Sequence, residues 1–170
     1  MWVGRSSTIF IADTTVNERP SPQLLADIAE QTAAVARRLG QEPRVAFLSY
    51  STFGNPPGEF LDNIRNAITL LDDRRVGFEY EGEMSPDVAL NPMMADRYPF
   101  SRLSGPANVL IMPGLQSANI SAKLLKELGS GKMIGPLLMG MSKPVQVAPM
   151  TSTASDLVTL AVLAATGAMS

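Results

Sequence analysis

Hydroxyl side chains close to a glycine form the first stretch of this sequence that could bind an anion. They are Ser49, Ser51 and Thr52, with Gly54 close behind, and they follow a predicted strand at residues 44–49. Ligands of open α/β sheets bind beyond the carboxyl ends of the strands, where hydroxyls could donate to a phosphate and the glycine would allow close backbone approach. A capped turn, whose hydroxyls satisfy backbone groups, explains the same residues and is favoured by composition alone.

An amide and an ammonium group form a second candidate anion site. Asn119 and Lys123 follow a predicted buried strand at residues 109–112, and we expect a helix at about 119–128. The two side chains are four residues apart and therefore share one helix face, near an N-terminus whose free N–H groups favour anions. A polar cap beside a solvated lysine is the simpler interpretation and the more common one.

Acidic residues supply the third candidate chemistry. Asp156 stands three residues after Thr153 at the start of a predicted helix, where the pair resembles a capping box. The glutamates Glu79, Glu81 and Glu83 could bind Mg²⁺ or act in acid–base catalysis. We instead expect them on the solvent-facing side of a strand, because alternate residues of a strand share one side.

The composition excludes several classes of function. With 170 residues and a net charge of −2, the chain is long enough for one folded domain and lacks the basic surface expected for nucleic-acid binding. It contains no cysteine and no histidine, which excludes disulfides, thiolate or imidazole metal sites and histidine-based catalysis. No apolar run predicts a membrane span, and we interpret the N-terminus as a cut into a longer protein rather than a signal peptide.

Short apolar runs alternate with amphipathic segments, which predicts a three-layer α/β/α domain with a mostly parallel or mixed sheet. Ser21 and Pro22 predict the start of the first helix, and Gly40 predicts its end. Phe60 and Ile64 are expected on the apolar face of the second helix. The other expected strands lie at residues 8–12, 77–80, 134–139 and 145–148, and the other expected helices begin at Pro86 and Thr153.

A loop is expected at residues 91–104 because prolines interrupt it. It contains apolar side chains that we expect to form an exposed patch, namely Met93, Met94, Tyr98 and Phe100.

Several motifs in a fixed order give the chain a specific resemblance. The hydroxyl stretch fits Leu-Ser-x-Ser-Thr-x-Gly, the amide stretch fits Asn-Ile-x-x-Lys, and two further motifs lie at residues 13–17 and 81–89. From about Phe10 to Ala165 the sequence resembles the phosphate acetyl/butyryltransferase family. The resemblance implies the fold of the second domain of phosphotransacetylase, which is similar to the isocitrate and isopropylmalate dehydrogenases.

The resemblance also implies how the chain is divided. Residues 1–145 are expected to form the phosphotransacetylase-like second domain. Residues 146–170 are expected to form a returning strand and helix that complete the first domain in the full-length family module.

The chain departs from the family at a catalytic position. Residues 143–145 and Asp156 match the family, whereas Pro149 and Met150 replace the Ser-Arg pair between them. A guanidinium can bind a phosphate or thioester oxygen through two hydrogen bonds, and a thioether cannot. In the family, the acid at the position of Asp156 deprotonates the thiol of coenzyme A. Without its arginine partner this carboxylate is vestigial, so we expect no catalytic residue in this chain.

The resemblance therefore implies a ligand site without catalysis. Domains of this kind stand at the C-terminus of the large bacterial NADP-dependent malic enzymes, so we expect a non-catalytic regulatory and oligomerisation domain that senses acetyl-CoA. The expected ligand-binding residues are Ser49, Ser51, Thr52, Gly54, Asn119, Lys123 and Asp156.

Partners and cofactors follow from the same resemblance. The chain is expected to be cytoplasmic, to form a homodimer or higher homo-oligomer, and to hold no metal or cofactor itself. NADP and a divalent metal are expected only in the absent N-terminal part, which would convert malate to pyruvate by oxidative decarboxylation. Two alternatives are a phosphate acetyltransferase fragment, which would move acetyl between phosphate and coenzyme A, and a purely structural dimerisation module.

Overall fold

Alternating apolar side chains give the central strands two buried faces. The computed structural model describes residues 1–168, and in this part of the chain six strands form one sheet in the order β4-β3-β5-β2-β1-β6. The strands β2 to β5 run parallel, whereas β1 is antiparallel to both β2 and β6. The strands are β1 (Trp2–Val3), β2 (Thr8–Ala12), β3 (Arg44–Leu48), β4 (Glu79–Met84), β5 (Val109–Ile111) and β6 (Lys132–Met133).

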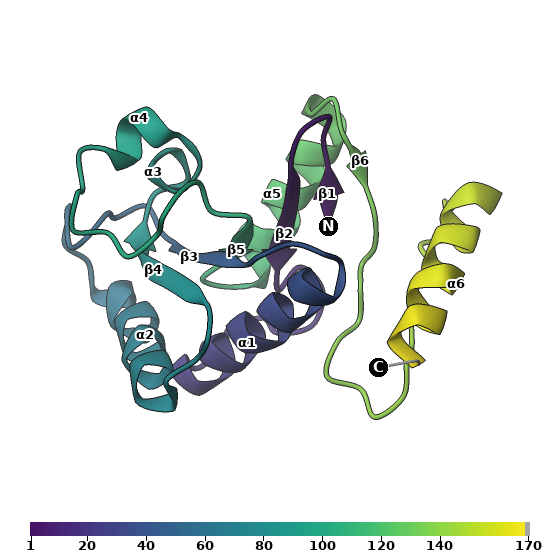
Figure 1. Cartoon of the computed structure of the whole chain (residues 1–170), viewed down its shortest axis with the longest axis horizontal. Helices are drawn as coiled ribbons and strands as arrows, with labels where there is room; N and C mark the ends of the chain where they lie inside the picture. Colours follow the sequence, from purple (N-terminus) through teal and green to yellow (C-terminus); the bar gives the residue numbers. More distant parts are fainter. Residues whose placement is uncertain (169–170) are drawn as a thin grey trace.

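Helices cover both faces of the sheet (Figure 1). The buried residues Val45 and Phe47 of β3 belong to a core shared with α1 and α2, whereas Ala46 and Leu48 belong to a core shared with α3 and α5. The predicted three-layer α/β/α fold with a mostly parallel sheet is therefore confirmed. The helices are α1 (Pro22–Arg38), α2 (Asp62–Arg74), α3 (Pro86–Leu90), α4 (Pro92–Ala95), α5 (Leu115–Leu128) and α6 (Ala154–Ala168), and a short 3₁₀ turn, η1 (Glu59–Leu61), precedes α2.

Local hydrogen bonds set helix ends where the sequence predicts them. The hydroxyl of Ser21 accepts a bond of 3.3 Å from the N–H of Leu24, and Gly40 adopts a φ of 77° beyond the end of α1. At α6, the N–H of Thr153 donates to Asp156 Oδ2 at 3.0 Å, and the N–H of Asp156 donates to Thr153 Oγ1 at 3.3 Å. This reciprocal pair is the predicted capping box.

The predicted strands at residues 134–139 and 145–148 are wrong. The sheet ends at β6, and the chain then runs as an extended connection to α6, as Figure 1 shows. Pro136 and Pro144 interrupt this connection, and a proline has no N–H to donate to a strand ladder.

Two further predictions are wrong in their bounds. The strand predicted at 77–80 instead occupies Glu79–Met84, and α4 lies within the predicted loop. Phe60 does not join the apolar face of α2, because it lies in η1 with its side chain exposed, and Leu61 is buried there.

The glutamates of β4 also correct the sequence-based expectation. Glu81 and Glu83 were expected to face solvent, but they are only 7% and 2% exposed. Both Nε and Nη2 of Arg65, from α2, donate to the carboxylate of Glu83 at 3.1 Å, and the N–H of Gly54 donates to it at 2.7 Å. Charged side chains can be buried in a strand when donors of this kind surround them.

These contacts hold Glu83 in its ionised form. Burial raises the pKa of Glu83, but the hydrogen bonds from Arg65 and from the backbone N–H of Gly54, with the charge of Arg65, lower the pKa below its usual value. The resulting stabilisation is therefore complete above the unfolded-state pKa of about 4.3, and it is lost as the pH falls through the lower folded-state pKa.

We predict that Glu83→Gln lowers the free energy of unfolding at neutral pH by about 1–3 kcal/mol, because a charge-assisted network is broken in the interior. Urea unfolding at pH 7 measures this loss, and the gap between wild type and variant should narrow below about pH 4. The exposed Glu59 gives a matched control, since Glu59→Gln should change the free energy of unfolding by less than about 0.5 kcal/mol. Equal stability of wild type and Glu83→Gln at pH 7 would contradict the prediction.

Candidate functional site

A cavity of about 490 Å³ lies among α5, β6 and the first turns of α6, and we call it pocket 1. It is formed beyond the carboxyl end of β2, where ligand sites of parallel sheets lie. Its polar lining residues are Thr14, Thr15, Asn119, Lys123, Lys126, Lys132, Thr151, Ser152, Asp156 and Thr159. Hydroxyl, amide and ammonium donors thus surround one space, which suits an anionic ligand.

Ammonium groups outnumber carboxylates in pocket 1. Lys123 and Lys126 come from one face of α5, and Lys132 comes from β6. Lys132 Nζ lies 3.3 Å from an oxygen of Asp156, so the two lining residues form an ion pair. Hydrogen bonds from the hydroxyl and N–H of Thr153, and then from Lys132, hold the pKa of Asp156 below its ordinary value, so this carboxylate is ionised at neutral pH.

Asn119 and Lys123 both line pocket 1, as their spacing suggested, but not at a helix N-terminus. Helix α5 begins at Leu115, four residues earlier than predicted, and the N–H of Ala118, which is buried, donates to the carbonyl of Gly114 in the first turn. Asn119 Nδ2 donates to the carbonyl of Thr14 at 3.0 Å, which connects α5 to the turn after β2. The expectation that Asn119 lies beside the free N–H groups of the helix N-terminus is therefore wrong.

Asp13 shapes that turn from the end of β2. Its carboxylate accepts hydrogen bonds from the N–H groups of Thr15, Val16 and Asn17 at 2.8–3.1 Å, and from the Asn17 amide at 2.7 Å. The side chain thus serves as the hydrogen-bonding centre of an Asx-type turn. It positions Thr14 and Thr15 at pocket 1 instead of offering a free carboxylate.

The positions of the replaced Ser-Arg pair lie at the edge of this site. Pro149 lines pocket 1, whereas the side chain of Met150 is fully exposed. Neither residue can donate a side-chain hydrogen bond to a ligand.

The hydroxyl stretch at residues 49–54 is not brought to pocket 1. Ser51 and Thr52 are buried; the Ser51 hydroxyl donates to Glu83 at 3.3 Å, and the Thr52 hydroxyl is 2.9 Å from that of Ser85. These hydroxyls therefore bond within the protein, as in the capped-turn alternative. Asn119, Lys123 and Asp156 are the expected ligand residues that the structure gathers in one place.

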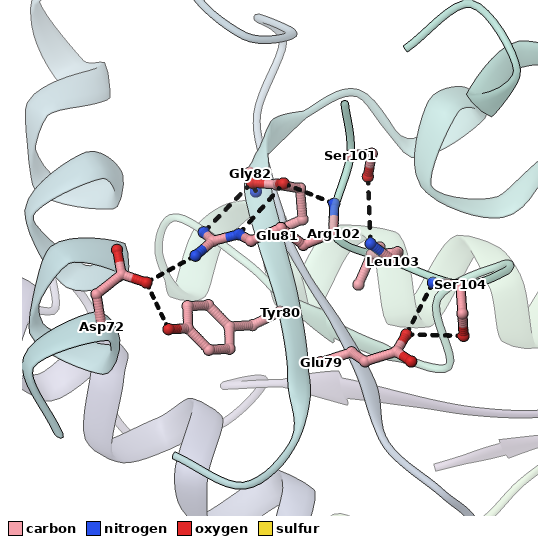
Figure 2. A network of polar contacts seen from close by, with 9 residues as sticks. All are labelled: Asp72, Glu79, Tyr80, Glu81, Gly82, Ser101, Arg102, Leu103 and Ser104. Carbon is pink, nitrogen blue, oxygen red and sulfur yellow. Dashed lines mark hydrogen bonds and ion pairs between the residues drawn. The ribbon is translucent and has the colours of Figure 1, made fainter. Parts of the chain in front are cut away.

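A second polar cluster lies along β4, at the edge of the sheet (Figure 2). The guanidinium of Arg102 lies 2.6 Å from Asp72 and 4.5 Å from the centre of the Tyr80 ring. The backbone N–H of Arg102 donates to the carboxylate of Glu81 at 3.0 Å. The Tyr80 hydroxyl donates to Asp72 at 2.6 Å, and burial, followed by this bond, raises the pKa of Tyr80 to about 12.

The contacts within this cluster point to a structural role. Glu79 accepts hydrogen bonds of 2.8 and 2.9 Å from the N–H and hydroxyl of Ser104, just beyond Arg102 (Figure 2). The acidic side chains of β4 thus bind the backbone of residues 101–104 along the strand. The cluster anchors that loop to the sheet: Arg102 pairs with Asp72 and Glu81, and Glu79 is held by Ser104.

The described residues contain neither a metal-binding cluster nor a membrane-spanning helix. In residues 1–168, no group of three or more histidine, cysteine, aspartate or glutamate side chains is placed to hold a metal ion. In the same range no helix has the length and apolar character needed to cross a membrane.

Lys126 and Lys132 are site residues that the sequence reasoning missed. Lys126 is three residues beyond Lys123, and this spacing alone could have placed it on the same helix face. Lys132 had no comparable signal, because it reaches pocket 1 only through the pairing of β6 with β1.

Comparisons with known proteins agree along nearly the whole chain. The sequence profile of the phosphate acetyl/butaryl transferase family matches residues 1–165. The NADP-dependent malic enzyme of Rhizobium meliloti is 56% identical over 161 residues, which cover 95% of this chain and 21% of that protein. The phosphate acetyltransferase of Clostridium acetobutylicum is 38% identical over 157 residues, which cover 91% of this chain and 47% of that protein.

The fold has a similarly extensive match. A crystal structure of a phosphotransacetylase from Streptococcus pyogenes superposes with a TM-score of 0.94 at 34% identity, covering 99% of this chain and 52% of that chain. The chain therefore spans about a fifth of the malic enzyme (21%) and about half of the transacetylases (47% and 52%).

Proposed function

This chain belongs to the phosphate acetyl/butaryl transferase family, and on that basis we propose that it is a non-catalytic regulatory and oligomerisation domain of an NADP-dependent malic enzyme that senses acetyl-CoA. The observation that carries the proposal is the lining of pocket 1. Lys123, Lys126 and Lys132 remain there as anion-binding groups, whereas Pro149 stands where the family places a polar catalytic residue.

The chemistry of pocket 1 supports a phosphate-bearing ligand. Three ammonium groups face one carboxylate, and hydroxyls of Thr14, Thr15 and Thr151 add neutral donors. Acetyl-CoA carries several phosphate charges, and charge-assisted hydrogen bonds from lysine are well suited to them. A volume of about 490 Å³ lies within the range of small-molecule sites.

The part of the malic enzyme that lies outside the match is long enough to hold a separate catalytic domain. The match to the Rhizobium meliloti malic enzyme covers 21% of that protein, so there is room for a separate catalytic part. We place NADP, the divalent metal and the oxidative decarboxylation of malate there. Helix α6 would pack against another part of the longer protein, since the side chains of Leu157, Val158 and Val162 are exposed; residues 169 and 170 of the expected returning segment lie outside the described residues.

Lys123→Ala in the full-length enzyme should weaken the control of malate oxidation by acetyl-CoA by about 1–3 kcal/mol, the usual size of allosteric coupling. The measurement is an acetyl-CoA titration of malate oxidation. Lys143→Ala is the matched control, because Lys143 is an exposed lysine outside the lining of pocket 1, and it should reproduce the wild-type curve. Superimposable curves for Lys123→Ala and wild type would remove Lys123 from the site, and a wild-type enzyme indifferent to acetyl-CoA would favour the structural dimerisation module.

We also expect no transacetylase activity. Loss of one group that stabilises developing charge typically lowers the rate by about a hundred- to a thousandfold, and neither Pro149 nor Met150 can replace a guanidinium. The assay follows acetyl-CoA formation from acetyl phosphate and coenzyme A, with an authentic phosphotransacetylase as the positive control and heat-denatured protein as the blank. Turnover clearly above the blank would instead support the phosphate acetyltransferase alternative.

A homodimer is the expected assembly, since two-fold symmetric dimers are the commonest closed oligomers. The expected apolar patch is partly present: Met93 and Phe100 are exposed, whereas Met94 and Tyr98 pack against the core. Phe100→Glu should shift sedimentation of the 170-residue chain from two copies toward the 18.2 kDa monomer. Leu128→Glu, a change at an exposed apolar residue at the end of α5, should leave the dimer intact. Wild-type protein that sediments only as the monomer at micromolar concentration contradicts the assembly.

A further inference from the structure

The ion pair of Lys132 and Asp156 places a negative charge of the protein beside one of the three ammonium groups of pocket 1. Lys132 Nζ lies 3.3 Å from Asp156 Oδ1, and both residues line the cavity. The other carboxylate oxygen, Oδ2, accepts hydrogen bonds from the N–H and the hydroxyl of Thr153 at 3.0 and 2.8 Å. The capping box thus fixes the carboxylate at the start of α6, with its first oxygen beside Lys132.

The other two lysines of pocket 1 differ from Lys132 in this respect. Within residues 1–168, neither Lys123 nor Lys126 forms an ion pair with a carboxylate. An anion can therefore bind to these two ammonium groups of α5 without displacing a carboxylate of the protein. To reach the third ammonium group, the anion must take Lys132 from Asp156.

A phosphate group is suited to this exchange. The Asp156 carboxylate carries one negative charge, whereas a phosphate monoester carries about −1.5 to −2 at pH 7 and has three acceptor oxygens. The side chains of Lys132 and Asp156 are 52% and 35% exposed, and ion pairs with this exposure contribute little to stability. The carboxylate released by the exchange would keep its hydrogen bonds with Thr153 and regain water.

We infer that Asp156 competes with a phosphate group of the ligand for Lys132, and that this competition keeps the affinity of pocket 1 below the value its three lysines would give. The inference rests on the proposed function and gives a role to the residue whose family counterpart is the catalytic acid. If the Asp156 carboxylate instead bound the ligand directly, removal of its charge would have the opposite effect on affinity.

The experiment titrates the full-length enzyme with acetyl-CoA and, separately, with inorganic pyrophosphate, and measures both affinities by calorimetry. NADP is present in excess, so that its own site is occupied. Asp156→Asn removes the charge and keeps an oxygen that can accept from Thr153. This variant should bind both probes about three- to fivefold more tightly, the upper part of the range for an exposed ion pair. Lys132→Met should weaken the binding of both probes by about threefold or more.

A double-mutant cycle separates this competition from a general effect of charge. Removal of any carboxylate near the cavity favours an anion, but competition for Lys132 requires that lysine. In the Lys132→Met background, Asp156→Asn should therefore change either affinity by less than about 1.5-fold. Thr153→Ala is the matched control for the start of α6, because it removes the hydroxyl of the capping box and keeps the Asp156 charge. It should not tighten the binding of either probe.

Each outcome decides one of the two ideas. Unchanged or weaker binding of both probes by Asp156→Asn overturns the competition, and so does equal tightening with and without Lys132. A wild-type enzyme that binds pyrophosphate but not acetyl-CoA overturns the proposed sensing of acetyl-CoA, and the pyrophosphate affinities of the four proteins in the cycle then decide the competition. A wild-type enzyme that binds neither probe overturns the proposed function and this inference together.

Discussion

A parallel sheet that is apolar on both faces imposes the main constraint on this molecule. Water cannot cover either face, so the chain must return across the sheet through helices on both sides. Val109 and Ile111 of β5 face one layer, and Leu110 faces the other. Polar side chains are thereby confined to strand ends and connections. Pocket 1 lies at such an end because its lining residues Thr14 and Thr15 belong to the turn that follows β2.

Strand β4 is the exception to this constraint, because it carries buried acidic side chains whose charges are satisfied by nearby donors. It brings Glu81 and Glu83 into the interior at an edge of the sheet, and each carboxylate needs donors to remain there. Arg65 of α2 and Arg102 of the following loop supply them. Both arginines also bind their own segments to β4, in addition to the apolar contacts that α2 makes with the sheet. The hydroxyl stretch after β3 also bonds to this network, through Ser51 and Gly54 to Glu83, and does not line pocket 1.

Local sequence signals predicted the features that depend on nearby residues. The cap at Ser21, the turn at Gly40 and the capping box of Thr153 and Asp156 each need only a few neighbouring residues, and each is present. Features decided by distant partners were not predictable in this way. The burial of Glu83 depends on an arginine 18 residues away, and the position of Lys132 depends on its pairing with β1. The resemblance to a known family predicted the fold. The distance between the hydroxyl stretch and pocket 1 depends on the three-dimensional structure and could not be predicted from either motif.

Helix α6 has one face that lines pocket 1 and another that is exposed. Asp156, Thr159 and Leu160 form part of pocket 1, whereas Leu157, Val158 and Val162 are exposed on the same helix. Lys132 and Asp156 form the one ion pair that joins α6 to the rest of the described chain. If docking on the outer surface of α6 changed the affinity of pocket 1 for a ligand, that ligand would change the affinity of the docking by the same factor. A change in the position of α6 would thus alter the lining of pocket 1 and the exposed apolar surface of the helix together.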